Sequence, residues 1–306
     1  MTGARSSLEH AAAAARLAGD RADWWLAGAL SAAPFLVWLP FVLTVTGGLR
    51  ESDLAFAGAG VISSGLFPWN LLLLAGLAAL LVVVGCLLAA LGEVGLLRAA
   101  GRGTPDRSLS RETEVAFSVL LAASLPAVAA IAALASATAA VAPAEFTAPD
   151  IGGPLLLRIA GHLVPLLVLV VVLMLAGQAL GAAALRRGTG PDALPIDAAL
   201  KAGLSDLRRH PIRRIGVALA STLAELLAFV LALALLGVLW APIRVELAAG
   251  QLVSPQALLL LVGFMAIWLA LVLAFGALHA WVSIWWNFEL ADGDAEASTA
   301  AQEAHR

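Results

Sequence analysis

Six apolar stretches, each long enough to cross a bilayer as a helix, set the strongest limit on the fold of this chain. A hydrocarbon core about 30 Å thick needs roughly 20 apolar residues per helix. The stretches are continuous rather than alternating, and a helix satisfies its own backbone polar groups in lipid, which favours helices over strands. The sequence therefore predicts an all-α integral membrane protein with six transmembrane helices near residues 24–45, 70–97, 115–141, 155–185, 215–240 and 257–286.

The composition narrows the classes of function. The chain of 306 residues is 61% hydrophobic and 13% charged, so it cannot cover a soluble surface with polar groups. Its single cysteine, Cys86, lies in an apolar run and excludes a disulfide framework. The formal net charge of -3 gives no indication of a nucleic-acid partner.

The distribution of positive charge predicts the orientation, because short cytoplasmic loops hold an excess of Lys and Arg. With a cytoplasmic N-terminus, only Arg50, Arg158 and Arg244 of the 18 basic residues fall outside. Every basic residue except Lys201 is Arg, a bias typical of GC-rich bacterial genomes. We therefore expect a multi-pass protein of the bacterial cytoplasmic (inner) membrane with both termini in the cytoplasm.

An internal repeat organises the chain. Spans two, four and six share an Ala-Leu pair in Ala89–Gly92, Gln178–Gly181 and Gly276–His279. We infer three parallel helical-hairpin repeats, because each unit contains two spans. The predicted organisation is a leader at 1–23, a membrane domain at 24–288 with repeats at about 8–103, 104–190 and 191–288, and an acidic cytoplasmic tail at 289–306. We expect this tail to be solvated and disordered rather than a docking segment.

Each hairpin is preceded by a short cytoplasmic leader that we expect to lie in the inner interface. In the third leader, Pro195 can start a helix and Pro211 breaks it before span five. Leu8–Ala22 aligns with this leader, and Ser108–Phe117 is a shorter counterpart. The apolar stripe of the third leader is formed by Ile196, Leu200, Leu204 and Leu207. Candidate contacts to anionic lipid headgroups or to a protein partner are Lys201, Arg208, Arg209, Arg213 and Arg214.

The third leader also carries a family resemblance. Residues 202–211 read Ala-Gly-Leu-Ser-Asp-Leu-Arg-Arg-His-Pro and precede a hydrophobic hairpin. With the reiterated hairpins, this segment resembles six-span bacterial membrane domains of uncharacterised role, which occur alone or fused to glycerophosphodiester phosphodiesterases. The resemblance covers most of the chain and implies a fold. No phosphodiesterase domain is present in this sequence, so the resemblance implies no catalytic residue.

Polar side chains inside the spans are few, and each is costly in lipid. Glu225 lies about 16 Å beyond Arg214 along span five, close to the bilayer middle. Ser221 shares its helix face, and Gln178 and His279 on spans four and six lie about 12 Å below the inner boundary. These four residues form a candidate intramembrane polar site.

Two interpretations of this site remain open. The polar groups either tie helices together by hydrogen bonds or form a substrate or proton site. The first is favoured because no second carboxylate supports a relay, Glu93 being placed near the inner edge. For His279 alone, a packed interfacial histidine among tryptophans is favoured.

The sequence predicts a non-enzymatic function. It has no Gly-Lys-Ser/Thr nucleotide loop, no Gly-x-Ser-x-Gly elbow and no paired-His zinc helix, so we expect no enzyme activity, no cofactor and no metal. The predicted role is a scaffold or accessory protein that engages lipid or a partner through its basic leaders. The alternative is a transporter or exporter permease subunit with a polar site around Glu225.

Overall fold

A computed structural model describes residues 2–31, 69–100, 108–147, 155–189, 193–248 and 254–304. These residues are almost entirely helical, and residues 22–31 form one unlabelled helix. The other helices are α1 (Thr2–Gly19), α4 (Trp69–Ala99), α5 (Leu109–Thr147), α6 (Leu155–Thr189), α7 (Ile196–Arg209), α8 (Pro211–Ala248) and α9 (Pro255–Ala304).

Within the described ranges, five helices are long and apolar enough to cross a membrane. The candidate spans are Ala79–Ala99, Leu109–Ala142, Leu157–Thr189, Pro211–Glu246 and Pro255–Ala291. The expected all-α, multi-pass membrane class is therefore confirmed. Of the predicted first span, 24–45, residues 24–31 are helical and the rest lies outside the described residues.

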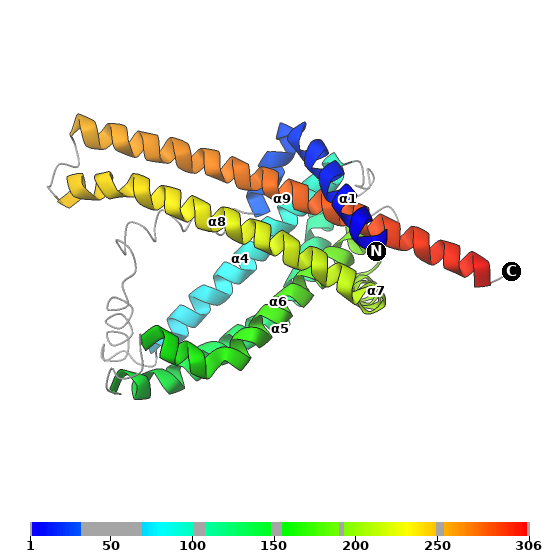
Figure 1. The fold of residues 1–306 in the computed structure, drawn as a ribbon, viewed down its shortest axis with the longest axis horizontal. Coiled ribbons are helices and arrows are strands. Elements are labelled where there is room, and N and C mark those ends of the chain that lie inside the picture. Colours follow the sequence, from blue (N-terminus) through cyan, green and yellow to red (C-terminus); the bar gives the residue numbers. More distant parts are fainter. Residues whose placement is uncertain are drawn as a thin grey trace.

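The helices meet at one end of the molecule and diverge from it. Helices α8 and α9 run side by side, while α4, α5 and α6 form a second group that spreads away from them (Figure 1). The two groups meet where α1 and α7 lie, which we call the α1–α7 end (Figure 1). A core of small and aromatic side chains joins the helices there, including Ala14, Trp24, Ala218 and Trp285. A separate core of Leu236, Trp240, Ile243 and Phe264 holds α8 to α9 farther out.

Glycines permit the closest helix contact in the described chain. A Cβ atom on Gly276 of α9 would overlap the carbonyl oxygen of Trp25, and one on Gly28 would overlap the carbonyl oxygen of Gly276. Both clashes involve backbone, which cannot swing away as a flexible side chain can. Helix 22–31 therefore lies directly against the backbone of α9 at this point.

Helix α7 packs against α6 through small residues. Ala199 and Gly203 are buried, and a Cβ atom on Gly203 would lie 3.0 Å from the backbone nitrogen of Ala184. This close approach divides the predicted apolar stripe, because Leu200 and Leu207 pack against the helical cores whereas Ile196 and Leu204 are exposed. The small residues Ala199 and Gly203 therefore set the buried face of α7, and its placement in the membrane interface stays a prediction.

The helix boundaries confirm the expected break at Pro211 and differ from the expectations for the leader at 108–117 and for the tail. The chain breaks between α7 and α8, where Pro211 was expected to end the leader helix. The leader expected at 108–117 is instead continuous with the span that follows it, because α5 runs unbroken from Leu109. The tail after Glu289 is helical as far as Ala304, in an Ala- and Glu-rich stretch that favours helix. The prediction of a disordered tail was therefore wrong.

We expect Gly276→Ala to destabilise the protein because the added methyl group has to push helix 22–31 away from α9. Overpacking of this kind costs about 1–3 kcal/mol. Gly263→Ala is the matched control in the same helix, because nothing lies within 4 Å of its Cβ position. The control is expected to melt at or above the parent temperature, since Ala has the higher helix propensity. Thermal unfolding in detergent measures both, and equal melting temperatures for the two variants would disprove the close contact.

Candidate functional site

Helix α9 carries a polar stripe in the half of its span nearer the α1–α7 end. His279, Ser283 and Asn287 are spaced four residues apart, so they lie on one face and cover about 12 Å of helix. All three fall within the candidate span Pro255–Ala291. Polar side chains in such a segment need partners inside the protein.

His279 lies between two carboxylates from different helices. Its Nδ1 is 3.2 Å from Oε1 of Glu225 on α8, and its Nε2 is 3.0 Å from Oε1 of Glu93 on α4. One imidazole therefore joins three helices. Each ring nitrogen faces a carboxylate oxygen, so a proton on either nitrogen has an acceptor.

The contacts continue from Glu93 toward the α1–α7 end. Ser283 Oγ donates to Oε2 of Glu93 at 2.8 Å, and Nη2 of Arg186 on α6 lies 3.8 Å from the same oxygen. Arg186 also donates to Ser283 O at 2.6 Å and to Asn287 Oδ1 at 2.6 Å. These groups form a connected series that we call the polar ladder, which comprises Glu225, His279, Glu93, Ser283, Arg186 and Asn287.

The charges of the ladder balance with one proton. Glu225 and Glu93 supply two negative charges when ionised, and the guanidinium of Arg186 supplies one permanent positive charge. The imidazolium form of His279 completes neutrality. Burial decreases from Arg186 toward Glu225. The exposed fraction of the side chain is 6% for Arg186, 13% for Glu93, 22% for His279 and 32% for Glu225.

The structure brings together two of the four residues predicted for this site. Glu225 contacts His279, whereas Gln178 accepts a hydrogen bond from Thr222 Oγ1 at 2.6 Å. Ser221 is buried and donates to the carbonyl oxygen of Ala218 in its own helix. Neither Gln178 nor Ser221 has a hydrogen bond to Glu225 in the described part of the chain.

Sequence reasoning missed Glu93 and Arg186. Glu93 was placed near the membrane edge by its distance from Arg98, and Arg186 was counted only as a loop charge. The repeat held a signal for Glu93, because Gly92 aligns with His279 and puts the neighbouring carboxylate at the same depth. No comparable signal identifies Arg186, whose guanidinium reaches α9 through its long side chain.

The five basic residues predicted to contact lipid or a partner fall into a pair that binds α9 and an exposed group of three. Arg214 is buried, donates two hydrogen bonds to Asp206 at 2.7 and 3.0 Å and one to Glu289 O at 2.9 Å. Arg213 donates to Glu289 Oε2 at 2.6 Å. These two arginines therefore hold α7 and α8 to α9. Lys201, Arg208 and Arg209 are exposed.

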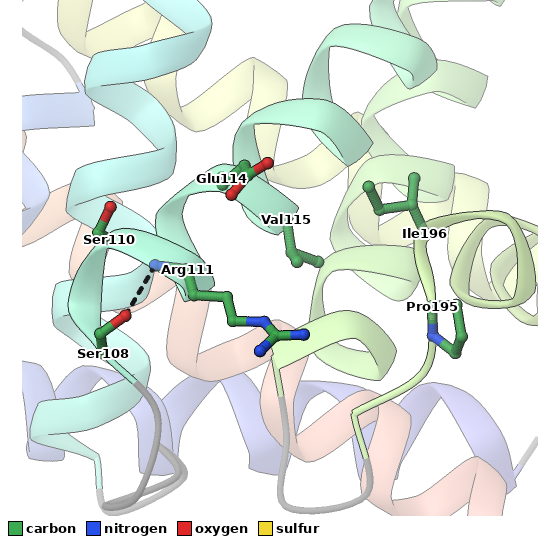
Figure 2. A pocket seen from close by; sticks show the side chains of 7 residues that line it. All are labelled: Ser108, Ser110, Arg111, Glu114, Val115, Pro195 and Ile196. Atoms are coloured by element: carbon green, nitrogen blue, oxygen red, sulfur yellow. Dashed lines mark hydrogen bonds between the residues drawn. The ribbon is translucent and has the colours of Figure 1, made fainter.

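An open groove of about 540 Å³ lies apart from the ladder, between the start of α5 and the start of α7 (Figure 2). Ser108 caps α5 here by accepting the backbone N–H of Arg111 at 3.3 Å. Arg111 and Glu114 bring opposite charges to its wall, so the groove favours neither anions nor cations. The lining residues are Ser108, Ser110, Arg111, Glu114, Val115, Pro195 and Ile196.

Metal-binding groups and similarity to known proteins also bear on the site. Across the ranges that the structure describes, no group of three or more His, Cys, Asp and Glu residues is arranged to hold a metal ion. Comparison of the chain with protein-family models, curated proteins and solved structures finds no significant match.

We expect Glu93→Gln to lower stability, because the amide keeps the shape of the carboxylate but leaves Arg186 without its opposite charge. It also turns one hydrogen-bond acceptor into a donor that faces other donors. Leaving buried polar groups unsatisfied costs about 1–3 kcal/mol. Glu114→Gln is the matched control, an exposed carboxylate whose replacement is expected to change stability by less than about 0.5 kcal/mol. Unfolding in detergent measures both variants, and equal stability would contradict a ladder that depends on the charge of Glu93.

Proposed function

We propose that this multi-pass membrane protein is a permease that moves protons through the polar ladder. The observation that carries the proposal is a single intramembrane imidazole that joins two carboxylates through its two ring nitrogens. Such a ring can accept a proton at one nitrogen and release another from the opposite one. This gives a physical route for proton transfer between Glu225 and Glu93.

The second carboxylate shifts the balance between the two roles considered for the chain. A lone Glu225 favours a structural tie, whereas Glu225 and Glu93 on one histidine provide the donor and acceptor that a relay requires. Glu225 is also the most exposed charged member of the ladder. A carboxylate facing hydrocarbon is costly, so the partial exposure of this side chain favours contact with water or with a polar substrate.

The proposal includes the orientation and the repeat. Under the predicted topology, the α1–α7 end lies in the bacterial cytoplasm and the ladder leads from mid-membrane to that side. Three sequence-aligned positions each face the first helix of their own hairpin: Gly92 faces Ser31, Gly181 faces Ala123 and His279 faces Glu225. This agreement supports three parallel hairpins.

Proton flux through reconstituted protein tests the permease proposal. We expect vesicles that contain the parent protein and an internal pH dye to lose an imposed pH gradient several times faster than protein-free vesicles. Glu225→Gln removes one end of the relay and should reduce the rate to that of protein-free vesicles. Glu114→Gln, outside the ladder, should leave the rate unchanged.

Stability measurements on the same variants separate transport from a structural tie. Glu225→Gln keeps the shape of the side chain and an oxygen that can accept from His279 Nδ1, so it should fold and melt like the parent, whereas Glu225→Leu should melt lower. Parent vesicles that hold the gradient as long as empty ones would reject the permease.

The exposed basic residues of α7 support a second role, in which the protein acts as a scaffold that engages anionic lipid. Lys201 is 81% exposed, and its 3.6 Å contact with Asp197, which is 74% exposed, is a surface pair of little strength. Arg208 and Arg209 are also exposed. Each basic residue near an anionic leaflet contributes about 1 kcal/mol.

We expect replacement of Lys201, Arg208 and Arg209 together by Gln to weaken binding of a fluorescent phosphatidylglycerol analogue to the purified protein. The loss should be about fivefold for each charge removed and should shrink in high salt. Arg111→Gln in the groove is the matched control, because it removes one exposed charge from α5 rather than from α7. Unchanged lipid binding after the triple replacement would exclude α7 as the lipid-binding surface.

A further inference from the structure

Glu225 has one carboxylate oxygen that takes no part in the polar ladder. Its Oε1 faces His279, while the described part of the chain supplies no hydrogen-bond partner for Oε2. The contact between Glu225 and His279, at 3.2 Å, is also longer than the 3.0 Å and 2.8 Å contacts that follow along the ladder. Glu225 is therefore the end of the ladder at which a partner can be exchanged.

The charges of the ladder specify what that partner is. The charged and titratable groups are Glu225 on α8, Glu93 on α4, Arg186 on α6 and His279 on α9. Two carboxylates and one guanidinium leave a single negative charge. The site can therefore hold one further positive charge, which is either the proton on His279 or a monovalent cation beside Glu225.

The surroundings of Glu225 favour an organic cation over a hydrated metal ion. Phe229 lies one turn beyond Glu225 on the same face of α8, and Phe275 lies one turn beyond His279 on the same face of α9. Both aromatic residues are half-buried and lie farther from the α1–α7 end than the ladder. Aromatic rings attract organic cations and cover their apolar parts.

We propose that Glu225 binds an organic ammonium ion in exchange for the proton on His279. The ammonium donates an N–H hydrogen bond to Oε2 of Glu225, the imidazolium N–H bond breaks, and the released proton passes to water. One positive charge enters and one leaves, so the net charge of the ladder stays at zero. This inference rests on the proposed permease and names its substrate class, which is organic amines in their protonated form.

Calorimetric titration of the detergent-solubilised full chain with benzylammonium chloride tests the exchange. Repeating the titration near neutral pH in two buffers of different ionisation enthalpy gives the number of protons released per cation bound. The expected value for the parent is about one, as charge balance at this site requires. Benzyl alcohol, which has the same ring without the charge, should give no saturable binding.

Two variants separate the roles of the carboxylate and the imidazole. Glu225→Gln should weaken benzylammonium binding by at least about tenfold, because the cation loses its charge partner. His279→Gln should bind the cation at least as tightly as the parent and release no proton, because the negative charge is then permanently open. A merely structural histidine would not produce that combination.

The possible results lead to different conclusions. Binding without proton release, binding that survives Glu225→Gln, or no saturable binding by the parent would each overturn the ammonium exchange. If Glu225-dependent proton flux is nevertheless present in vesicles, the permease stands and its substrate is of another class. If exchange occurs without flux, the ammonium site stands and the permease fails.

Discussion

An ionisable group inside an apolar span has to be neutralised within the protein, and this constraint governs how the helices meet. His279, Glu225, Glu93 and Arg186 come from four different helices, and none of them has a covalent neighbour that could balance its charge. Their contacts fix α4, α6 and α8 around α9 over about two turns of that helix. The close backbone contact at Gly276, one turn away, places helix 22–31 against the same part of α9.

The sequence was sufficient for the features that depend on one segment at a time. Long apolar runs predicted the helices, Pro211 predicted the break between α7 and α8, and the rarity of Glu225 and His279 in apolar spans singled them out. The predicted bounds differ from the ends of α4, α5, α6 and α8 by at most eight residues, whereas α9 ends 18 residues after the predicted bound. The helices continue past the apolar runs, α8 even through Pro242. Most of the first span and the loop after it lie outside the described residues.

Features that depend on contacts between distant segments were not predictable in the same way. Arg213 and Arg214 look like part of a basic surface when α7 and α8 are considered alone. They become internal because α9 continues beyond its expected end and brings Glu289 to them. Glu93 was discounted for a related reason, since its depth was judged by sequence distance from Arg98 rather than by the helix opposite. Long side chains such as Arg186 cross between helices in ways that spacing along one helix does not reveal.

Helix α9 is one unbroken helix of 50 residues. An unbroken helix has no joint, so it transmits a tilt along its whole length. Beyond Glu289, where Arg213 and Arg214 hold α9, the helix extends about 22 Å to Ala304, and a tilt of about 5° there moves its tip by about 2 Å. Helix α9 therefore carries any tilt at the membrane site out to its acidic end.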